Sequence, residues 1–387
     1  MKATTRVGTA FTAVAIVLAC ICSSASAFGA RQGHPFGHPF VPRSDHPVFV
    51  QTDNTSGNQV VAYDQAGDGS LTQAGVYNTG GLGGTLTGSV VDHLASQGSL
   101  AYDREDGLLY AVNAGSNTIS VFAVFGDHLA LRQVLSSGGS FPVSVAVDRG
   151  LVYVLNAEEG GSVQGYAVYS GRLVPIPGSS RALGLNPTET PQFTHTPGQV
   201  AFSPDGSQLI VTTKANGSDI DVFGVSPFGR LSKTPVVNSE PGAVPFAVTF
   251  DQQGNLVVAE AGTNSLARFA LGDNGTITQL DSVPTGQEAT CWVARAERHF
   301  YASNAASASI SNFQSSEGGQ LLTLMGNSET DPGTVDAAVS GDSRFLYVQT
   351  GGAGLVDEFA IGAQGALSRV GVITVPGAVG GEGIVAL

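Results

Sequence analysis

Residues 109–122 read LYAVNAGSNTISVF, and this stretch decides the fold class of the chain. Its first four residues are aliphatic or aromatic, as in a buried strand, and the run ends at Asn113. The next four residues, AGSN, are of the kinds that tight turns favour. Apolar and polar residues then alternate up to Phe122, which is typical of a half-buried strand. The stretch therefore predicts two antiparallel strands joined by a short turn.

Seven stretches of this kind follow one another along the chain. Each is a β-rich run that ends in Asn, Thr or Glu, with an aromatic residue nine to eleven positions later. The runs end at Thr52, Asn113, Asn156, Thr213, Glu260, Asn304 and Thr350, and the aromatic residues are Tyr63, Phe122, Tyr166, Phe223, Phe269, Phe313 and Phe359. Successive run ends are 61, 43, 57, 47, 44 and 46 residues apart, a spacing typical of propeller blades. We therefore predict an all-β, seven-bladed β-propeller of four-stranded blades over residues 47–387.

The two ends of the repeat array predict how the ring closes. The second blade contains candidate strands at residues 99–103, 108–113, 118–124 and 129–135. The first blade lacks an innermost strand, whereas residues 383–387, GIVAL, match an innermost strand with no blade after it. We expect this C-terminal strand to complete the first blade, because closure removes exposed sheet edges.

The composition supports the all-β prediction and limits the partners. Of the 387 residues, 52 are Gly and 18 are Pro, and only 12% are charged. The formal net charge of −14 at pH 7 disfavours nucleic acids and anionic membranes as partners. We expect a monomer without a membrane span, and the sequence predicts no cofactor and no metal site.

The first 27 residues have the pattern of a signal peptide. Lys2 and Arg6 precede an apolar stretch, and residues 25–27, ASA, are the small residues that signal peptidase prefers. We therefore predict export to the periplasm or the extracellular space. A lipoprotein anchored at Cys20 is the alternative. Loss of the signal peptide leaves Cys291 as the only cysteine, so no internal disulfide is expected.

Three further segments do not fit the repeat. Residues 28–46 are rich in Pro, Gly and His, and we predict a linker there. Its histidines, His34, His38 and His46, could alternatively bind a metal. Residues 80–93 and 181–196 lengthen two blades, and both precede an innermost strand. We expect these two loops on the same face of the disk, either as binding loops or as neutral insertions.

The blade sequence at residues 109–122, together with VAFSPDG at residues 200–206, resembles the lactonase family of seven-bladed propellers. This family includes 6-phosphogluconolactonase-like and 3-carboxymuconate cyclase-like proteins. The segments SQG at residues 96–98 and CWV at residues 291–293 are similar to an exported bacterial branch of it. The resemblance covers residues 47–387 and implies a site at one mouth of the central channel.

The resemblance also implies particular residues at that mouth. A Glu is expected at the end of a second strand, and Glu260 matches it. A His is expected near residues 197–199, where this chain has Pro-Gly-Gln. Arginines are expected along the channel, and Phe246 and Asn304 stand at positions where a basic residue would fit the pattern.

Glu260 and Lys214 are the candidate catalytic residues. They lie at the ends of second strands in neighbouring blades, so they could meet across the channel mouth. Lactone hydrolysis needs a base that activates water and a cation near the developing oxyanion. This predicts Glu260 as the base and Lys214 as the electrostatic stabiliser. A structural salt bridge between the two blades is the alternative.

Seven further residues are candidates for ligand binding, namely Gln97, Asn113, Asn156, Gln199, Trp292, Asn304 and Asp336. The asparagines recur at equivalent strand ends and could ring the mouth or bond to the neighbouring backbone. The glutamines and Asp336 lie at or beside the starts of innermost strands, where side chains face the channel. Trp292 could stack on a ligand ring, or plug the channel beside a packed Cys291. His195 could replace the family's His as a base, or be an exposed loop residue.

Two hypotheses for function follow. The first is an exported, lactonase-like propeller that hydrolyses or forms a small unphosphorylated lactone, so that its partner is the lactone or the hydroxy acid. A phosphorylated lactone is disfavoured because the channel lacks an arginine cluster for phosphate. The second is a non-catalytic propeller that binds a small molecule, glycan or protein on the same face, since fold does not imply function.

Overall fold

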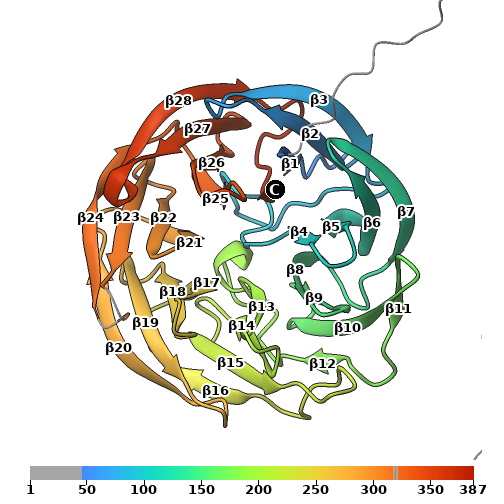
Figure 1. Cartoon of the computed structure of the whole chain (residues 1–387). Helices are drawn as coiled ribbons and strands as arrows, with labels where there is room; N and C mark the ends of the chain where they lie inside the picture. Colours follow the sequence, from blue (N-terminus) through green and yellow to red (C-terminus); the bar gives the residue numbers. More distant parts are fainter. Residues whose placement is uncertain (1–45, 317–318, 320) are drawn as a thin grey trace, which may run out of the picture. The chain divides into compact units, whose positions relative to one another are not determined.

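Seven antiparallel sheets surround a central axis in the computed structural model, which describes residues 46–316, 319 and 321–387 (Figure 1). Each sheet is one blade with four strands in order from the axis to the rim, and the sheet of blade 3 has a fifth, two-residue strand. The all-β, seven-bladed prediction is therefore confirmed. The predicted signal peptide, and the predicted linker up to residue 45, lie outside the described residues.

The strands form four concentric layers, and blades 1 to 7 each contribute one strand to every layer. In blade order, the innermost strands are β29 (Ile384–Ala386), β4 (Leu100–Asp103), β8 (Pro142–Asp148), β13 (Val200–Phe202), β17 (Pro245–Phe250), β21 (Thr290–Ala296) and β25 (Thr334–Val339). The second strands are β1 (Pro47–Gln51), β5 (Leu108–Asn113), β9 (Leu151–Asn156), β14 (Gln208–Thr212), β18 (Leu256–Glu260), β22 (His299–Asn304) and β26 (Phe345–Thr350). The third strands are β2 (Gln59–Gln65), β6 (Thr118–Phe125), β10 (Ser162–Tyr169), β15 (Asp219–Gly224), β19 (Ser265–Leu271), β23 (Ser309–Ser315) and β27 (Leu355–Ile361). The outermost strands are β3 (Leu71–Asn78), β7 (His128–Ser136), β11 (Arg172–Pro175), β16 (Val236–Ser239), β20 (Ile277–Pro284), β24 (Leu322–Glu329) and β28 (Leu367–Thr374).

The sequence pattern explains which strands are buried. All six residues of β5 are buried, as expected for an apolar run, whereas β7 is largely exposed beyond its second residue. The seven recurrent aromatic residues lie on the third strands and are at most 2% exposed. Phe122 of blade 2, for example, belongs to the same core cluster as Phe49 of blade 1. Burying one such side chain contributes about 2 kcal/mol, so the repeated aromatic residue holds neighbouring blades together.

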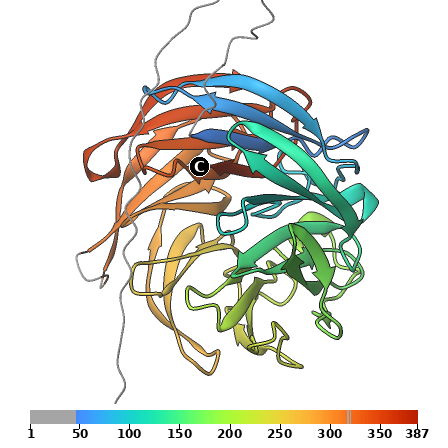
Figure 2. The same ribbon diagram turned by 45° about the vertical axis from the view of Figure 1, so that its right-hand side comes forward.

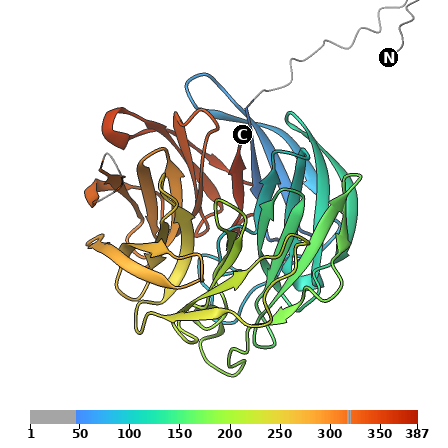
Figure 3. The same ribbon diagram turned by 60° about the horizontal axis from the view of Figure 1, so that its bottom comes forward.

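The ring closes through the C-terminus, as predicted. Strand β29 pairs antiparallel with β1, and Val48, Phe49 and Val50 lie opposite Ala386, Val385 and Ile384. The Leu387 N–H also donates to the Pro47 carbonyl at 3.0 Å. Figures 2 and 3 show the dark red C-terminal strand beside the blue N-terminal strand. The four predicted strands of blade 2 agree with the observed ones to within one residue at each end.

Helical structure in the described part of the chain is limited to three short 3₁₀ turns, at Ala114–Ser116, Gln192–Thr194 and Ala363–Gly365. None of the helices found there has the length and apolar character needed to cross a membrane. One small element was not expected: β12 (Arg181–Ala182) at the start of the second long loop pairs with β10.

Candidate functional site

The two long loops, residues 80–93 and 181–196, meet on one face of the propeller. This is the face where innermost strands begin and second strands end, and we call it the mouth face. The Thr87 N–H donates to Gln192 Oε1 at 2.8 Å, and the Phe193 N–H donates to the Thr87 carbonyl at 3.4 Å. The prediction that both loops share a face is therefore confirmed.

A short segment before β4 closes the central channel just inside the mouth face. Gln97 Oε1 accepts the Val293 N–H at 2.9 Å, and Gln97 Nε2 donates to the Val293 carbonyl at 3.0 Å. Trp292 Nε1 donates to the Ser96 carbonyl at 2.6 Å. Because β4 and β21 belong to blades that are not neighbours, these bonds cross the channel, and Figure 1 shows the chain between β3 and β4 passing near the ring centre. Gln97 therefore fastens this channel plug.

Above the plug lies a cavity of about 360 Å³. The long loops contribute Val90, Val91 and Phe193 to its lining, and the innermost strands contribute Phe246, Cys291 and Trp292; Asp92, Ala95, Ala289, Ala305 and Ala306 complete it. The Phe246 and Trp292 rings are tilted against each other with centroids 4.9 Å apart. We call this space the mouth cavity. Its lining is almost entirely apolar, and among the described residues it includes no arginine.

Lys214 is buried behind the lining of this cavity. Its Nζ donates to the carbonyl oxygens of Ala95 and Phe193, both at 2.6 Å, and to Thr196 Oγ1 at 3.1 Å. The ammonium also lies 5.2 Å from the centre of the Phe246 ring, in cation–π geometry. Burial lowers the pKa of Lys214 to about 7. Lys214 therefore fastens the second long loop and the start of the plug segment to the blade that carries it.

Asp92 and Cys291 are the ionisable side chains in the cavity lining. The Asp92 carboxylate accepts the N–H groups of Leu94 at 2.8 Å and Ser96 at 3.0 Å. Burial raises the pKa of Asp92 to about 6, although these bonds and the attraction of Lys214 oppose that shift. Burial also raises the pKa of the Cys291 thiol to about 12. Asp92 is therefore the group that can exchange a proton near neutral pH, whereas Cys291 is a poor nucleophile.

The predicted catalytic pair does not come together as an ion pair in the described part of the chain. Glu260 Oε2 accepts the hydroxyls of Ser265 at 2.8 Å and Thr263 at 3.1 Å, while Lys214 bonds to the loops. Burial raises the pKa of Glu260, and the three neighbouring hydroxyl groups oppose the shift. Glu260 does not line the mouth cavity. The salt bridge that was the alternative for these two described residues is not formed, and a catalytic role for Glu260 stays a prediction.

Most of the predicted binding residues hold the blades together. Asn113 Nδ2 donates to Ser120 Oγ at 2.8 Å, Asn304 Nδ2 to Ser311 Oγ at 2.9 Å, and Asn156 Nδ2 to the Ser137 carbonyl at 3.3 Å. These three side chains are fully buried within their blades. They bond to neighbouring strands and turns, which is the structural alternative considered for them.

Three further candidates lie at the starts of innermost strands. Gln199 Oε1 accepts the Val248 N–H of the next blade at 2.6 Å. Asp336 accepts the Ala337 N–H at 2.9 Å, and burial raises its pKa to about 7. Of the seven predicted binding residues, Trp292 alone lines the mouth cavity. His195, considered as a substitute base, has its Nδ1 next to Thr194 Oγ1 and the Pro191 carbonyl.

Of the four buried carboxyl groups beside the plug, Asp336 was a predicted binding residue and the other three were not predicted. Asp53, Asp92, Asp336 and Glu382 are at most 4% exposed. Burial raises the pKa of Asp53 to about 8, and burial together with the neighbouring carboxyl groups raises the pKa of Glu382. We call these four residues the carboxyl hub. The described residues contain no group of three or more His, Cys, Asp or Glu that could hold a metal ion. His34 and His38, considered as metal ligands, lie outside those residues.

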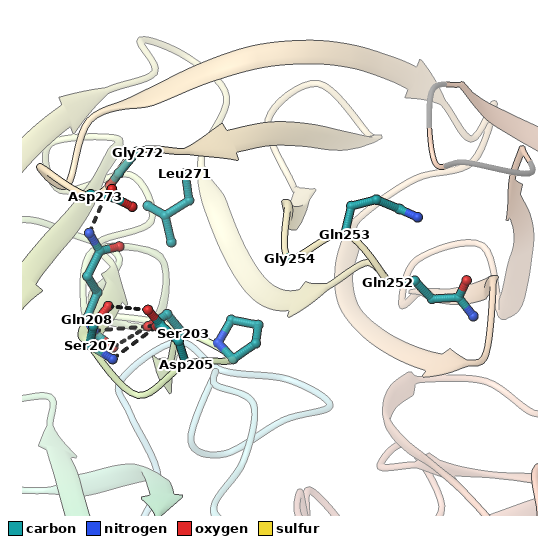
Figure 4. Close-up of a pocket in the computed structure, with 11 residues that line it drawn as sticks. Ser203, Asp205, Ser207, Gln208, Gln252, Gln253, Gly254, Leu271, Gly272 and Asp273 are labelled. Atoms are coloured by element: carbon teal, nitrogen blue, oxygen red, sulfur yellow. Dashed lines mark hydrogen bonds between the residues drawn. The ribbon is translucent and has the colours of Figure 1, made fainter.

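A second hollow of about 360 Å³ lies on the opposite face, between the turns of blades 4 and 5 (Figure 4). It is polar, and one of its two carboxylates is already used: Asp205 accepts hydroxyl bonds from Ser203 at 2.6 Å and Ser207 at 2.7 Å. These bonds lower the pKa of Asp205 to about 2. Gln208 likewise donates to the Gly272 carbonyl at 2.9 Å. The mouth cavity is therefore the better candidate site.

No protein-family model and no curated protein sequence matches this chain. Several solved structures match it. The periplasmic gluconolactonase PpgL of Pseudomonas aeruginosa is 17% identical with a TM-score of 0.71, and the match covers 88% of this chain and 99% of that one. A putative 6-phosphogluconolactonase from Bacteroides fragilis is 17% identical with a TM-score of 0.69, covering 89% and 98%. A Lactobacillus plantarum protein is 20% identical with a TM-score of 0.70, covering 88% and 99%. The fold of this chain is thus the seven-bladed, 6-phosphogluconolactonase-like propeller.

Proposed function

We propose that the mouth cavity binds a small, uncharged, unphosphorylated lactone. The observation that carries this proposal is the composition of the cavity lining, which combines aromatic and aliphatic side chains with one carboxylate, Asp92. An anionic phosphate would meet this carboxylate without an arginine to bind it. A neutral ring compound of modest size fits both the chemistry and the 360 Å³ volume. The lactonases that share this fold make lactones the first chemical class to test.

Hydrolysis of the bound lactone is the reaction we propose. Asp92 takes a proton from a water molecule as the water oxygen attacks the lactone carbonyl carbon. The ring C–O bond then breaks, and protonated Asp92 gives its proton to the released alkoxide, which yields the hydroxy acid and restores the carboxylate. Lys214 acts as a positioning residue in this scheme, because it holds the loops and favours the ionised form of Asp92.

Binding without turnover is the second candidate, and a specific observation favours it. Both oxygens of the Asp92 carboxylate already accept backbone N–H bonds, from Leu94 and Ser96. A carboxylate held in this way has fewer free lone pairs for a water molecule. The protein would then be a lactone-binding or small-molecule-binding propeller with the same cavity.

One pair of measurements tests both candidates. Calorimetric titration with a panel of neutral lactones measures binding, and a pH-stat measures acid release. We expect binding in the wild type and a loss of turnover of about 100-fold or more in Asp92→Asn, with the dissociation constant little changed. Glu260→Gln is the matched carboxylate control, and an equal loss there would instead support the sequence-based assignment of Glu260. The proposal fails if no lactone in the panel binds.

We also propose that the protein is exported, on the strength of residues 1–27. Cell fractionation should find the protein outside the cytoplasm with an N-terminus at Phe28. The lipoprotein alternative predicts instead a membrane-associated form that Cys20→Ser releases.

A further inference from the structure

The mouth cavity has a buried end and an exposed end: its ionisable side chains, Asp92 and Cys291, lie at the buried end, and Val90 of the first long loop lies at the exposed end. Asp92 and Cys291 are 4% and 8% exposed, whereas Val90 on the same loop as Asp92 is 80% exposed. The exposure of Val91 and Phe193 is intermediate. A ligand in this cavity would therefore have its polar group near Asp92 and its apolar part along the two loops.

The loop wall is firmly anchored. Leu86 N–H donates to the His93 carbonyl at 2.8 Å, and His93 N–H donates to the Gly380 carbonyl at 2.9 Å. The Val91 carbonyl lies so close to Gly351 that a Cβ atom there would collide with it. Phe193 is fixed from the other side, because its carbonyl accepts the Lys214 ammonium at 2.6 Å. A wall held in this way can select ligands by shape, since little reorganisation is needed when they bind.

The lining also disfavours sugar lactones. A polyhydroxy ligand loses hydrogen bonds to water when it enters an apolar cavity, and each hydroxyl group then needs a new partner. The lining of the mouth cavity supplies one carboxylate, Asp92, and its two oxygens are already bonded. An alkyl chain has no such requirement and gains from burial against Val90, Val91 and Phe193.

We infer that the preferred ligand is a lactone that carries an alkyl chain, and that Val90, Val91 and Phe193 determine the specificity for that chain. This inference rests on the proposed function, because it names the class of lactone that the mouth cavity takes. The lactone ring lies at the Asp92 end, and the chain lies against the two long loops.

The test is a calorimetric titration with γ-butyrolactone, γ-hexalactone, γ-decalactone and freshly dissolved glucono-δ-lactone. Each buried methylene strengthens binding roughly threefold to fourfold. γ-Decalactone should therefore bind on the order of a hundredfold more tightly than γ-hexalactone, whose chain is four methylenes shorter. Glucono-δ-lactone should bind more weakly than either. Affinities that stay flat or fall as the chain grows would overturn the inference while leaving the proposed function intact; absence of binding by every lactone would overturn both.

Two matched pairs of variants test where the alkyl chain of the ligand lies. Val90→Asp should weaken the binding of γ-decalactone at least about tenfold and change the affinity for γ-butyrolactone less than about twofold. Val237→Asp, at a position that is 56% exposed on outermost strand β16, should change the affinity for neither lactone. Phe193→Ala should reduce the gain in affinity per methylene, whereas Phe228→Ala, at an 85% exposed residue on the opposite face, should not. Circular dichroism and thermal melting check that each variant is folded. If Val90→Asp and Phe193→Ala fold and leave the chain-length dependence unchanged, the assignment of the loop wall is wrong.

Discussion

The two halves of the mouth face are built from the same repeat but have opposite chemistry. In blades 4 to 6, the starts of the innermost strands and the adjoining loops place Phe193, Phe246 and Trp292 around an open apolar cavity. In blades 7 and 1, the corresponding positions place Asp336 and Glu382 in a closed polar hub. The comparison shows that the repeat supplies the scaffold, while the long loops and the residues at the starts of the innermost strands decide whether a part of the mouth is filled or free.

The hub is closed because its carboxyl groups hold the plug and the C-terminus. Glu382 Oε1 accepts the Gly98 N–H at 2.9 Å, and Asp53 Oδ2 accepts the Glu382 N–H at 2.8 Å. Ser99 Oγ donates to the Glu382 carbonyl at 2.8 Å. The closing strand, the plug and blade 1 therefore meet at Glu382. In the apolar half, the bonds of Lys214 to Ala95, Phe193 and Thr196 lie behind the cavity lining, so the cavity itself has room for a ligand.

Deletion of residues 382–387 should have the largest effect, because it removes both strand β29 and Glu382. We expect a loss of more than about 4 kcal/mol in the free energy of unfolding, enough to prevent cooperative folding of the ring. Urea unfolding followed by circular dichroism measures this loss. Glu382→Gln is the control, since it resembles the protonated acid, and it should cost less than about 1.5 kcal/mol. A truncated protein that unfolds at the wild-type urea concentration would show that the C-terminal strand does not close the ring.

Lys214→Met tests the contacts that the buried ammonium group makes with the plug segment and with the second long loop. The substitution leaves the carbonyl oxygens of Ala95 and Phe193 without their donor, and it leaves Asp92 without its neighbouring cation. We expect a loss of about 2–4 kcal/mol in unfolding free energy, measured by urea titration. Lys233→Met is the matched control, because Lys233 is exposed, and it should change stability by less than about 0.5 kcal/mol. Equal effects of the two substitutions would contradict the anchoring role of Lys214.

The pH dependence of stability should report on the protonation of the carboxyl hub. The folded pKa of Asp53 is about 8 and that of Asp336 about 7, both above the ordinary value of 3.8. Stability from these groups is complete below the unfolded pKa and is lost as pH rises through the folded pKa, so we expect a fall between about pH 4 and 7 from Asp336 and between about pH 4 and 8 from Asp53. Lys214, with its lowered pKa of about 7, acts in the opposite sense above pH 7. The urea midpoint should therefore decrease from pH 5 to pH 7 and then level off.

Asp53→Asn and Asp205→Asn separate this effect from the general charge of the protein. Asp53→Asn should flatten the decrease between pH 5 and 7. Asp205 lies on the opposite face with a pKa lowered to about 2, so its stabilisation is lost only as pH falls through that range, and its variant should leave the slope unchanged. A wild-type midpoint that rises steadily from pH 5 to 7 would refute the proton-holding hub.

The fold could be predicted in detail because its signals are local. Strand alternation, turn residues and the recurrent aromatic residue lie within about fifteen residues of one another, and counting strands was enough to place β29 in blade 1. The site could be predicted only in part. Trp292 lines the mouth cavity, but Lys214 has a φ of 53°, and its side chain bonds to Ala95, which is 119 residues away in sequence.

Such contacts explain what the sequence could not reveal. Asp92 and Phe193 lie in loops without strand periodicity, and the two loops are held by bonds between residues distant in sequence, such as Thr87 with Gln192. Glu382 was overlooked because it lies in a Gly-rich segment that reads as a turn. The one available signal was indirect: both loops lengthen the repeat at the same place, and lengthened loops on one face are where a site is expected.

The smallest expected effect concerns Cys291, which reports on how far the apolar half is shielded from water. The thiol is buried and its pKa is raised to about 12, so little thiolate forms near pH 8. In a chain with Cys20→Ser and Cys22→Ser, Ellman's reagent should modify folded protein at least about 100-fold more slowly than urea-unfolded protein. Cys291→Ala should alter stability by only about 1 kcal/mol, since a small apolar group replaces a thiol that has no catalytic partner. Rapid modification of the folded protein would mean that the charged reagent reaches strand β21, and the apolar half would then be a water-filled opening instead of a binding cavity.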